Sequence, residues 1–172
     1  AVQAEGRTAL KVRRWRTLFG VAWAVWIIDL ATKIWAVENL SYRSNIKVFG
    51  DFFQLTYVRN PGAAFSFASG ATIFLSLFSL VVMIAILYYS PKITSGGWAV
   101  VLGLVLGGIL GNMVDRIFRE PGVLRGHVID WLQLPNWPVF NIADTAIVTA
   151  ALISMVLTAR NTPPITKVGS QV

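Results

Sequence analysis

Two aspartates lie in neighbouring motifs beside strongly apolar sequence. Asp130 ends GHVID (126–130), and Asp144 stands in VFNIADTAIV (139–148). Two carboxyl groups that meet cannot both ionise easily, so they share a proton. Such a pair can activate water against an amide and protonate the departing amine. The sequence therefore predicts a hydrolytic site, provided that the intervening loop turns back and brings the two carboxyls together.

Polar side chains elsewhere could hold a substrate or a developing oxyanion beside this pair, because amide and guanidinium groups donate hydrogen bonds. The candidates are Asn60, Asn112, Arg116 and Asn141. Asn112, Asp115 and Arg116 follow a spacing of i, i+3 and i+4, which puts them on one face of a helix. Asp115 is thus an alternative acid, and the residues alone leave the choice between Asp115 and Asp130 open.

A second charged pair, Asp29 and Lys33, is spaced i, i+4 and can pair on one helical face. Lys33 and Arg116 have long side chains, so both could instead extend to water at a membrane surface. Asp144 is too short to do so, and an acid inside an apolar span usually faces the protein interior or a wet cavity. Polar clusters at a similar depth on separate helices favour one shared polar site.

The composition indicates a membrane protein. Of 172 residues, 55% are hydrophobic and 13% charged, whereas soluble domains carry roughly 25% charged residues. The absence of cysteine excludes a disulfide framework, a thiol nucleophile and a Cys-ligated metal. We interpret the single histidine, His127, as a hydrogen-bonding loop residue. The net charge of +7 is interpreted as a determinant of membrane orientation rather than of nucleic-acid binding.

Four windows are apolar over the roughly 20 residues that a bilayer requires. They predict a single integral membrane domain over 1–172, with spans at 18–37, 72–89, 98–117 and 139–159 and loops at 38–71 and 118–138. The basic segment RTALKVRRWR (7–16) predicts that both termini are cytoplasmic, so the polar clusters lie near the extracytoplasmic face. The first span is too long and too polar at its far end to be a cleaved signal peptide.

Local patterns add structural detail to these segments. Alternating apolar and polar residues at 53–58 predict a short strand, and Asn60-Pro61-Gly62 then predicts a turn. Pro138 is expected in the first turn of the last helix, where its missing N–H costs nothing. The third span carries small residues every four positions, which lets another helix approach closely: Gly103, Gly107 and Gly111.

Five motifs, taken in order, resemble lipoprotein signal peptidase, the bacterial signal peptidase II family. They are DLATK (29–33), NPGAAFS (60–66), GNMVDR (111–116), GHVID (126–130) and FNIAD (140–144). The resemblance covers nearly the whole chain. It implies an all-α membrane protein of the bacterial cytoplasmic membrane, with four transmembrane helices and a small extracytoplasmic β-cradle. Leu30 stands where the family commonly has Gln, and Trp131 where Phe is frequent.

The resemblance also implies a chemistry. A member would be a monomeric intramembrane aspartyl endopeptidase, with no metal or organic cofactor. It would remove the signal peptide from diacylglyceryl-modified prolipoproteins by cutting before the lipidated cysteine, so its partners are these substrates and membrane lipids. The catalytic pair falls on Asp130 and Asp144 rather than Asp115. Substrate-binding or supporting roles fall on Asn60, Gly62, Asn112, Arg116, Asn141, Asp29 and Lys33.

Two other functions fit part of the pattern. Charged residues within spans are typical of a small transporter or proton-coupled carrier. A transporter would place polar residues across the membrane depth and commonly contain a repeat, and the sequence has neither feature. A non-catalytic assembly subunit held by the glycine face would leave the five motifs unexplained. The sequence therefore favours the peptidase.

Overall fold

The computed structural model describes residues 2–62 and 71–165, with side chains described over 14–62 and 72–165. This part of the chain contains four long helices: α1 (Val2–Leu40), α2 (Ala71–Tyr89), α3 (Gly96–Phe118) and α4 (Ile142–Ala159). A single 3-10 turn, η2 (Ser90–Lys92), follows α2. Each long helix includes a stretch that is long and apolar enough to cross a membrane. The predicted all-α membrane fold with four spans is confirmed.

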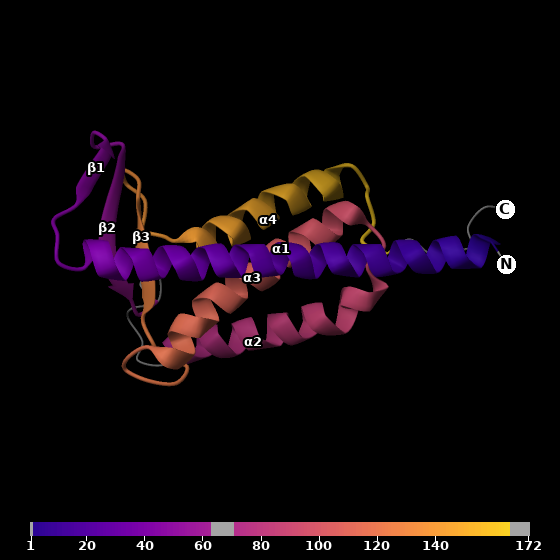
Figure 1. The fold of residues 1–172 in the computed structure, drawn as a ribbon, viewed down its shortest axis with the longest axis horizontal. Coiled ribbons are helices and arrows are strands. Elements are labelled where there is room, and N and C mark those ends of the chain that lie inside the picture. Colours follow the sequence, from indigo (N-terminus) through magenta and orange to yellow (C-terminus); the bar gives the residue numbers. More distant parts are fainter. Residues whose placement is uncertain (1, 63–70, 166–172) are drawn as a thin grey trace.

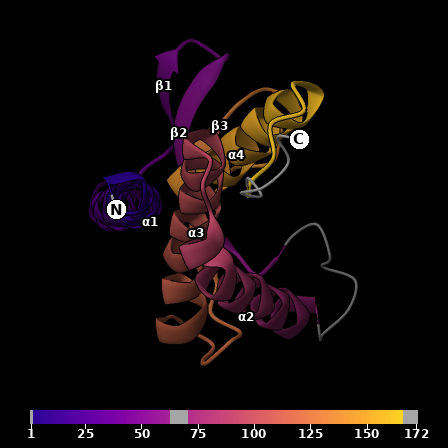
Figure 2. The same cartoon turned by 90° about the vertical axis from the view of Figure 1, so that its right-hand side faces the viewer.

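The helices run along one another with a small sheet across one end, which we call the sheet end (Figure 1). Viewed along the bundle, α1, α2 and α4 lie on different sides of α3 (Figure 2). α3 packs most extensively against α1 and α4 and is the most buried of the four spans. Side chains on α3 are therefore placed to meet side chains from every other helix.

Glycines on α3 permit this close packing. A Cβ added at Gly103 would lie 2.6 Å from the Leu18 carbonyl oxygen of α1. One added at Gly108 would lie 2.7 Å from the Ala143 carbonyl oxygen of α4. The predicted glycine face is thus confirmed toward α1, and Gly108 supplies a second face, toward α4, that the four-residue spacing does not predict.

The sheet consists of β1 (Ile46–Phe49), β2 (Phe53–Asn60) and β3 (Val128–Gln133), paired antiparallel in that order. β2 confirms the strand predicted at 53–58, whereas β3 is a strand within a segment that the sequence predicts only as a loop. In the register of β2 and β3, Val58 pairs with Asp130 and Asn60 pairs with Val128. The end of β2 therefore delivers Asn60 to the neighbourhood of Asp130.

The last helix begins later than the predicted start at 139. After β3 the chain returns along it, and Phe140 forms an antiparallel bridge to that strand. Asn141 then caps α4: its Oδ1 accepts the Asp144 N–H at 2.9 Å, and Asp144 Oδ2 accepts the Asn141 N–H at 3.3 Å. Pro138 precedes the helix, so its predicted place in the first turn is wrong.

The α1–α3 contact yields a test of the packing. Gly103→Ala should lower the free energy of unfolding by about 1–3 kcal/mol, because the new methyl group overlaps backbone that cannot move aside. Thermal unfolding of the purified protein in detergent would measure it. Gly20→Ala is the matched control, since an added Cβ there has nothing within 4 Å. Equal stability of the two variants would contradict the packing argument.

Candidate active site

Asp130 is a buried carboxyl held between two side-chain amides. It lies in β3 and is 1% exposed. Asn60 Nδ2 donates to its Oδ2 at 2.7 Å, and Asn141 Nδ2 donates to its Oδ1 at 2.6 Å. Burial, with a smaller contribution from the charge of Asp144, raises the pKa of Asp130 to about 7, although both amide hydrogen bonds act to lower it. Near neutral pH this carboxyl is therefore partly protonated.

Asp144 occupies a different environment at the start of α4. It is only partly buried and lines an open pocket. Its Oδ1 accepts the Asn112 side-chain N–H at 2.8 Å, and its Oδ2 accepts the backbone N–H of Asn141. Asn141 thus contacts both acids, because its side chain holds Asp130 while its backbone and cap hold Asp144. The structure brings the two predicted acids to one site through this residue.

Asn112 connects the site to the helices beneath it. Its Oδ1 accepts hydrogen bonds from Asn141 Nδ2 at 3.2 Å and from Lys33 Nζ at 3.0 Å. These two donors fix the orientation of the amide, so that its NH₂ group faces Asp144. The position of the Asp144 carboxylate therefore depends on a lysine from α1.

Lys33 is buried in an ion-pair cluster rather than extended to water. Its Nζ lies 2.7 Å from Asp29 Oδ2 and 2.9 Å from Asp115 Oδ2, and its side chain is 1% exposed. Asp29 Oδ1 accepts the N–H of Ala143 at 2.9 Å, and Asp115 Oδ2 accepts the N–H of Ile129 at 3.2 Å. The cluster thus joins α1 and α3 to the chain segments that carry both acids.

Asp115, the alternative acid in the sequence, belongs to this cluster. Besides Lys33, it forms an ion pair with Arg119, the residue that follows the end of α3. It is 1% exposed and does not line the pocket. With both oxygens occupied by cations and a backbone N–H, it has a supporting position, and so do Asp29 and Lys33.

Arg116 is also buried, at 8% exposure, so the alternative of extension to water is wrong for it as well as for Lys33. Its Nη1 donates to the carbonyl oxygens of Asn60 at 3.2 Å and Gly126 at 2.8 Å. Gly62 closes the turn after β2 with φ +108°, which favours glycine, and its N–H donates to Asn60 Oδ1 at 2.8 Å. The remainder of the NPGAAFS motif, 63–66, lies outside the described residues.

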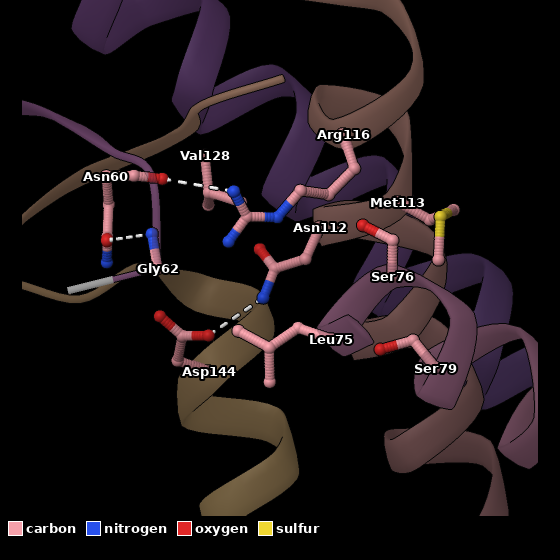
Figure 3. A pocket seen from close by; sticks show the side chains of 10 residues that line it. All are labelled: Asn60, Gly62, Leu75, Ser76, Ser79, Asn112, Met113, Arg116, Val128 and Asp144. Atoms are coloured by element: carbon pink, nitrogen blue, oxygen red, sulfur yellow. Dashed lines mark hydrogen bonds between the residues drawn. The ribbon is translucent and has the colours of Figure 1, made fainter. Parts of the chain in front are cut away.

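Around these groups is a partly open pocket of about 250 Å³ (Figure 3). Five of the predicted site residues line it: Asn60, Gly62, Asn112, Arg116 and Asp144. Asp130 and Asn141 are not among the lining residues, but each is hydrogen-bonded to one that is, Asp130 to Asn60 and Asn141 to Asp144. α2 contributes Leu75, Ser76 and Ser79, and Met113 and Val128 complete the lining. The sequence analysis misses these residues, although Ser76 and Ser79, spaced i, i+3 in an otherwise apolar span, were a usable signal.

The arrangement can support hydrolysis of an amide. Asp144 lines the pocket, and Asp130, with a pKa raised to about 7, lies close to it across Asn141, so that two carboxyl groups and several amide and guanidinium donors are gathered at one place. The lining combines residues of the apolar helices α2, α3 and α4 with residues of β2, β3 and the turn after β2, so the pocket lies where the helices meet the sheet.

Comparison with known proteins identifies similar chains along most of this sequence. The family model described as signal peptidase (SPase) II matches residues 21–160. A lipoprotein signal peptidase of Rhodococcus jostii is 49% identical over 141 residues, which is 82% of this chain and 71% of the relative. That of Mycobacterium leprae is 44% identical over 89% of this chain and 76% of its own length.

A solved structure has the same fold. It is described as a bacterial membrane enzyme, superposes with a TM-score of 0.74 at 27% sequence identity, and covers 85% of this chain and 94% of its own. A second structure with the same description gives a TM-score of 0.73 at 25% identity. The helices and the sheet together therefore match a known enzyme architecture.

The buried cluster predicts a strong stability effect. Lys33→Met should lower the free energy of unfolding by about 3–5 kcal/mol, because it leaves Asp29 and Asp115 buried without their shared counter-charge. Denaturation of the purified protein in detergent would measure the loss. Lys47→Met is the control, since the Lys47–Asp51 pair is 61% and 82% exposed and should contribute below about 1 kcal/mol. Similar losses in both variants would refute the role assigned to Lys33.

Proposed function

The chain belongs to the signal peptidase II family, and we propose that Asp130 and Asp144 are the groups with which it cuts its substrate. Members of this family remove signal peptides from prolipoproteins, so the chain is a peptidase with membrane-spanning helices. The proposal adds the aspartyl mechanism, the site residues and the position of the cut. The activity of the relatives argues against the two other functions considered, a transporter and a non-catalytic assembly subunit.

One observation carries the mechanism: Asn141 joins two carboxyls in unlike environments. Asp130 is enclosed and has a pKa raised to about 7, whereas Asp144 faces the pocket where substrate and water would meet. Two neighbouring carboxyls that share one proton divide the roles of acid and base. We assign the proton to Asp130 and the base role to Asp144.

In the proposed reaction, the Asp144 carboxylate takes a proton from water as the water oxygen bonds to the scissile carbonyl carbon. Asp130 gives its proton to the carbonyl oxygen, which forms a neutral tetrahedral diol. Asp144 then passes its proton to the amide nitrogen while Asp130 recovers one from the diol, and the C–N bond breaks. The products are a carboxylic acid and a free amine, and the pair regains its starting protonation state.

The neighbouring polar groups would bind the substrate. Arg116 uses Nη1 for two backbone carbonyls, and its other N–H groups have no acceptor among the described residues. They face the pocket and can donate to a substrate carbonyl (Figure 3). Asn60, Asn112 and Asn141 hold the acids in place, and Gly62 leaves space beside Arg116 for the substrate chain.

The substrate proposed is a diacylglyceryl-modified prolipoprotein, cut just before the lipidated cysteine. Each methylene group buried from water contributes about 0.8 kcal/mol. Two acyl chains therefore retain the substrate at the membrane more strongly than a short sequence motif can. A protein pocket is needed there because lipid supplies neither water nor hydrogen-bond partners for the scissile segment.

We further propose that the sheet end lies on the extracytoplasmic side and that both termini are cytoplasmic. The dense basic segment that leads into the first span supports this orientation, and Arg14 and Arg16 are its described side chains. Lys11 and Arg13 continue the basic segment, with side chains outside the described residues. A signal peptide that inserts from the cytoplasm would then present its cleavage site at the sheet end.

The first test of the mechanism is replacement of each acid. Asp130→Asn and Asp144→Asn should each reduce cleavage of a diacylglyceryl-modified prolipoprotein by roughly 100-fold or more, because each removes a proton-transfer group. A gel-shift assay with purified protein in lipid would measure the rate. Asp51→Asn is the control, because Asp51 is exposed at the β1–β2 turn. Undiminished cleavage by either acid variant would refute the two-aspartate mechanism. Unmodified precursor in the same assay tests the lipid requirement, and it should be cleaved more slowly than the lipid-modified form.

The second test is the pH dependence. Catalysis requires Asp130 in its protonated form, which is populated below its pKa of about 7. The value of kcat/KM should therefore fall as pH rises through this value, approaching a tenfold loss per pH unit. Asn60→Ala removes a hydrogen bond that lowers this pKa, so the alkaline limb should move to higher pH. A limb that stays in place in Asn60→Ala would contradict the assignment of the acid.

A further inference from the structure

The α2 wall of the pocket carries two serines with different bonding. Ser76 is buried, and its Oγ lies 3.0 Å from the Thr72 carbonyl oxygen and 2.9 Å from the Leu124 carbonyl oxygen. It therefore ties α2 to the loop that precedes β3. Ser79 lies one turn further along and lines the same pocket, but its hydroxyl has no hydrogen-bond partner among the described residues.

An unpartnered helical hydroxyl is unusual at this place. Serine and threonine in helices commonly donate to the carbonyl three or four residues earlier, as Thr32, Thr145 and Ser154 do. Ser79 instead presents its hydroxyl to the pocket (Figure 3). A bound molecule with an acceptor at this level would give the hydroxyl a hydrogen-bond partner.

The depth of Ser79 suggests which acceptor it meets. Ser79 lies two turns from the sheet-end start of α2, about 12 Å along its axis. Asp144 lies in the first turn of α4. The pocket thus runs from Asn60 at the end of β2, past Asp144, to Ser79 within the spans. A substrate chain entering from the membrane passes Ser79 before it reaches the acids.

The substrate has unsatisfied acceptors at this level. A signal peptide crosses the membrane as an apolar helix, and its last four carbonyls have no partner within the helix. Next to the scissile bond the chain must also be extended to expose its amide to both acids. The lipid cannot hydrogen-bond the freed carbonyls, and the ester carbonyls of the diacylglyceryl group have the same need.

We propose that the Ser79 hydroxyl donates a hydrogen bond to a carbonyl oxygen of the bound prolipoprotein, and so is a substrate-binding residue of this site. The inference rests on the proposed function, because it assumes that a signal peptide occupies the pocket. Ser79 takes no part in proton transfer. Its hydrogen bond holds the substrate equally in the ground state and the transition state, so it affects affinity rather than turnover.

Steady-state kinetics of the purified full chain in lipid would test the proposal. Ser79→Ala should raise KM for a diacylglyceryl-modified prolipoprotein about 3- to 10-fold, the effect of one hydrogen bond, with kcat within about twofold of wild type. The alkaline limb of the pH profile should not move. Ser154→Ala is the matched control, because this half-buried serine of α4 does not line the pocket and donates to its own helix.

A second substrate identifies the acceptor. An analogue with ether-linked alkyl chains lacks the ester carbonyls, so a KM effect of Ser79→Ala that persists with it assigns the bond to a peptide carbonyl. An effect that vanishes assigns the bond to an ester carbonyl, and either result supports the proposal. An unchanged KM for the ester-linked substrate, or a loss confined to kcat, would overturn it.

The same assay separates this inference from the proposed function. If Asp130→Asn or Asp144→Asn still cleaves at the wild-type rate, the mechanism fails whatever Ser79 does. If both acid variants are inactive while Ser79→Ala keeps the wild-type KM, the mechanism stands and only the role of Ser79 is refuted. The thermal unfolding temperature of Ser79→Ala should equal that of wild type or lie slightly above it, since alanine favours a helix.

Discussion

The rest of the structure depends on one buried ammonium group. Lys33 crosses from α1 to α3 and lies between Asp29 and Asp115, away from water. A charge inside apolar helices is tolerable only when its partners are in place, so the helices cannot separate without exposing it to lipid unpaired. The hydrogen bonds of the two acids to Ala143 and Ile129 extend this constraint to α4 and β3. The ion pairs thus fix where the site can be.

Above this cluster, two kinds of secondary structure present the two proposed catalytic carboxyls. Asp130 lies on β3, within the sheet, where burial raises its pKa. A helix N-terminus carries Asp144 at the pocket wall, where a side chain in the first turn meets free backbone N–H groups. The two aspartates thus have different surroundings, because one stands on a strand and the other at the start of a helix. Asn141 is the cap of that helix and a donor to the strand, which couples the two environments.

The sequence alone predicts those features that depend on apolar length or on local spacing. The spans follow from long apolar windows, and the Asp29–Lys33 pair and the strand at 53–58 follow from the spacing of residues. The burial of Lys33 cannot be predicted in this way, because a lysine side chain is long enough either to pair in the interior or to reach the surface. Its ion pair with Asp115 on α3 is what keeps it in the interior. β3 is not predicted because VIDWLQ (128–133) is buried almost throughout and shows no alternation.

The start of α4 and the pocket wall are missed for related reasons. The apolar residues before Asn141 continue the hydropathy of the span, so nothing in composition marks that they return along β3. α2 is apolar on nearly every side, so its pattern does not show which face meets α3 and which lines the pocket. The start of α4 and the pocket-lining face of α2 are both determined by contacts with distant segments, and such contacts produce no periodic pattern in a single sequence.

The groups that hold Asp130 are amides rather than cations, and this choice has a chemical consequence. An ammonium or guanidinium at hydrogen-bond distance would stabilise the carboxylate strongly and draw the proton off at neutral pH. The amides of Asn60 and Asn141 position the group at 2.7 and 2.6 Å with less electrostatic bias. Lys33 bonds to Asn112, Asp29 and Asp115 rather than to either acid of the pair, and Arg116 is held by backbone carbonyls. Because no cation bonds directly to Asp130, burial dominates its pKa, which allows this carboxyl to keep its proton near neutral pH.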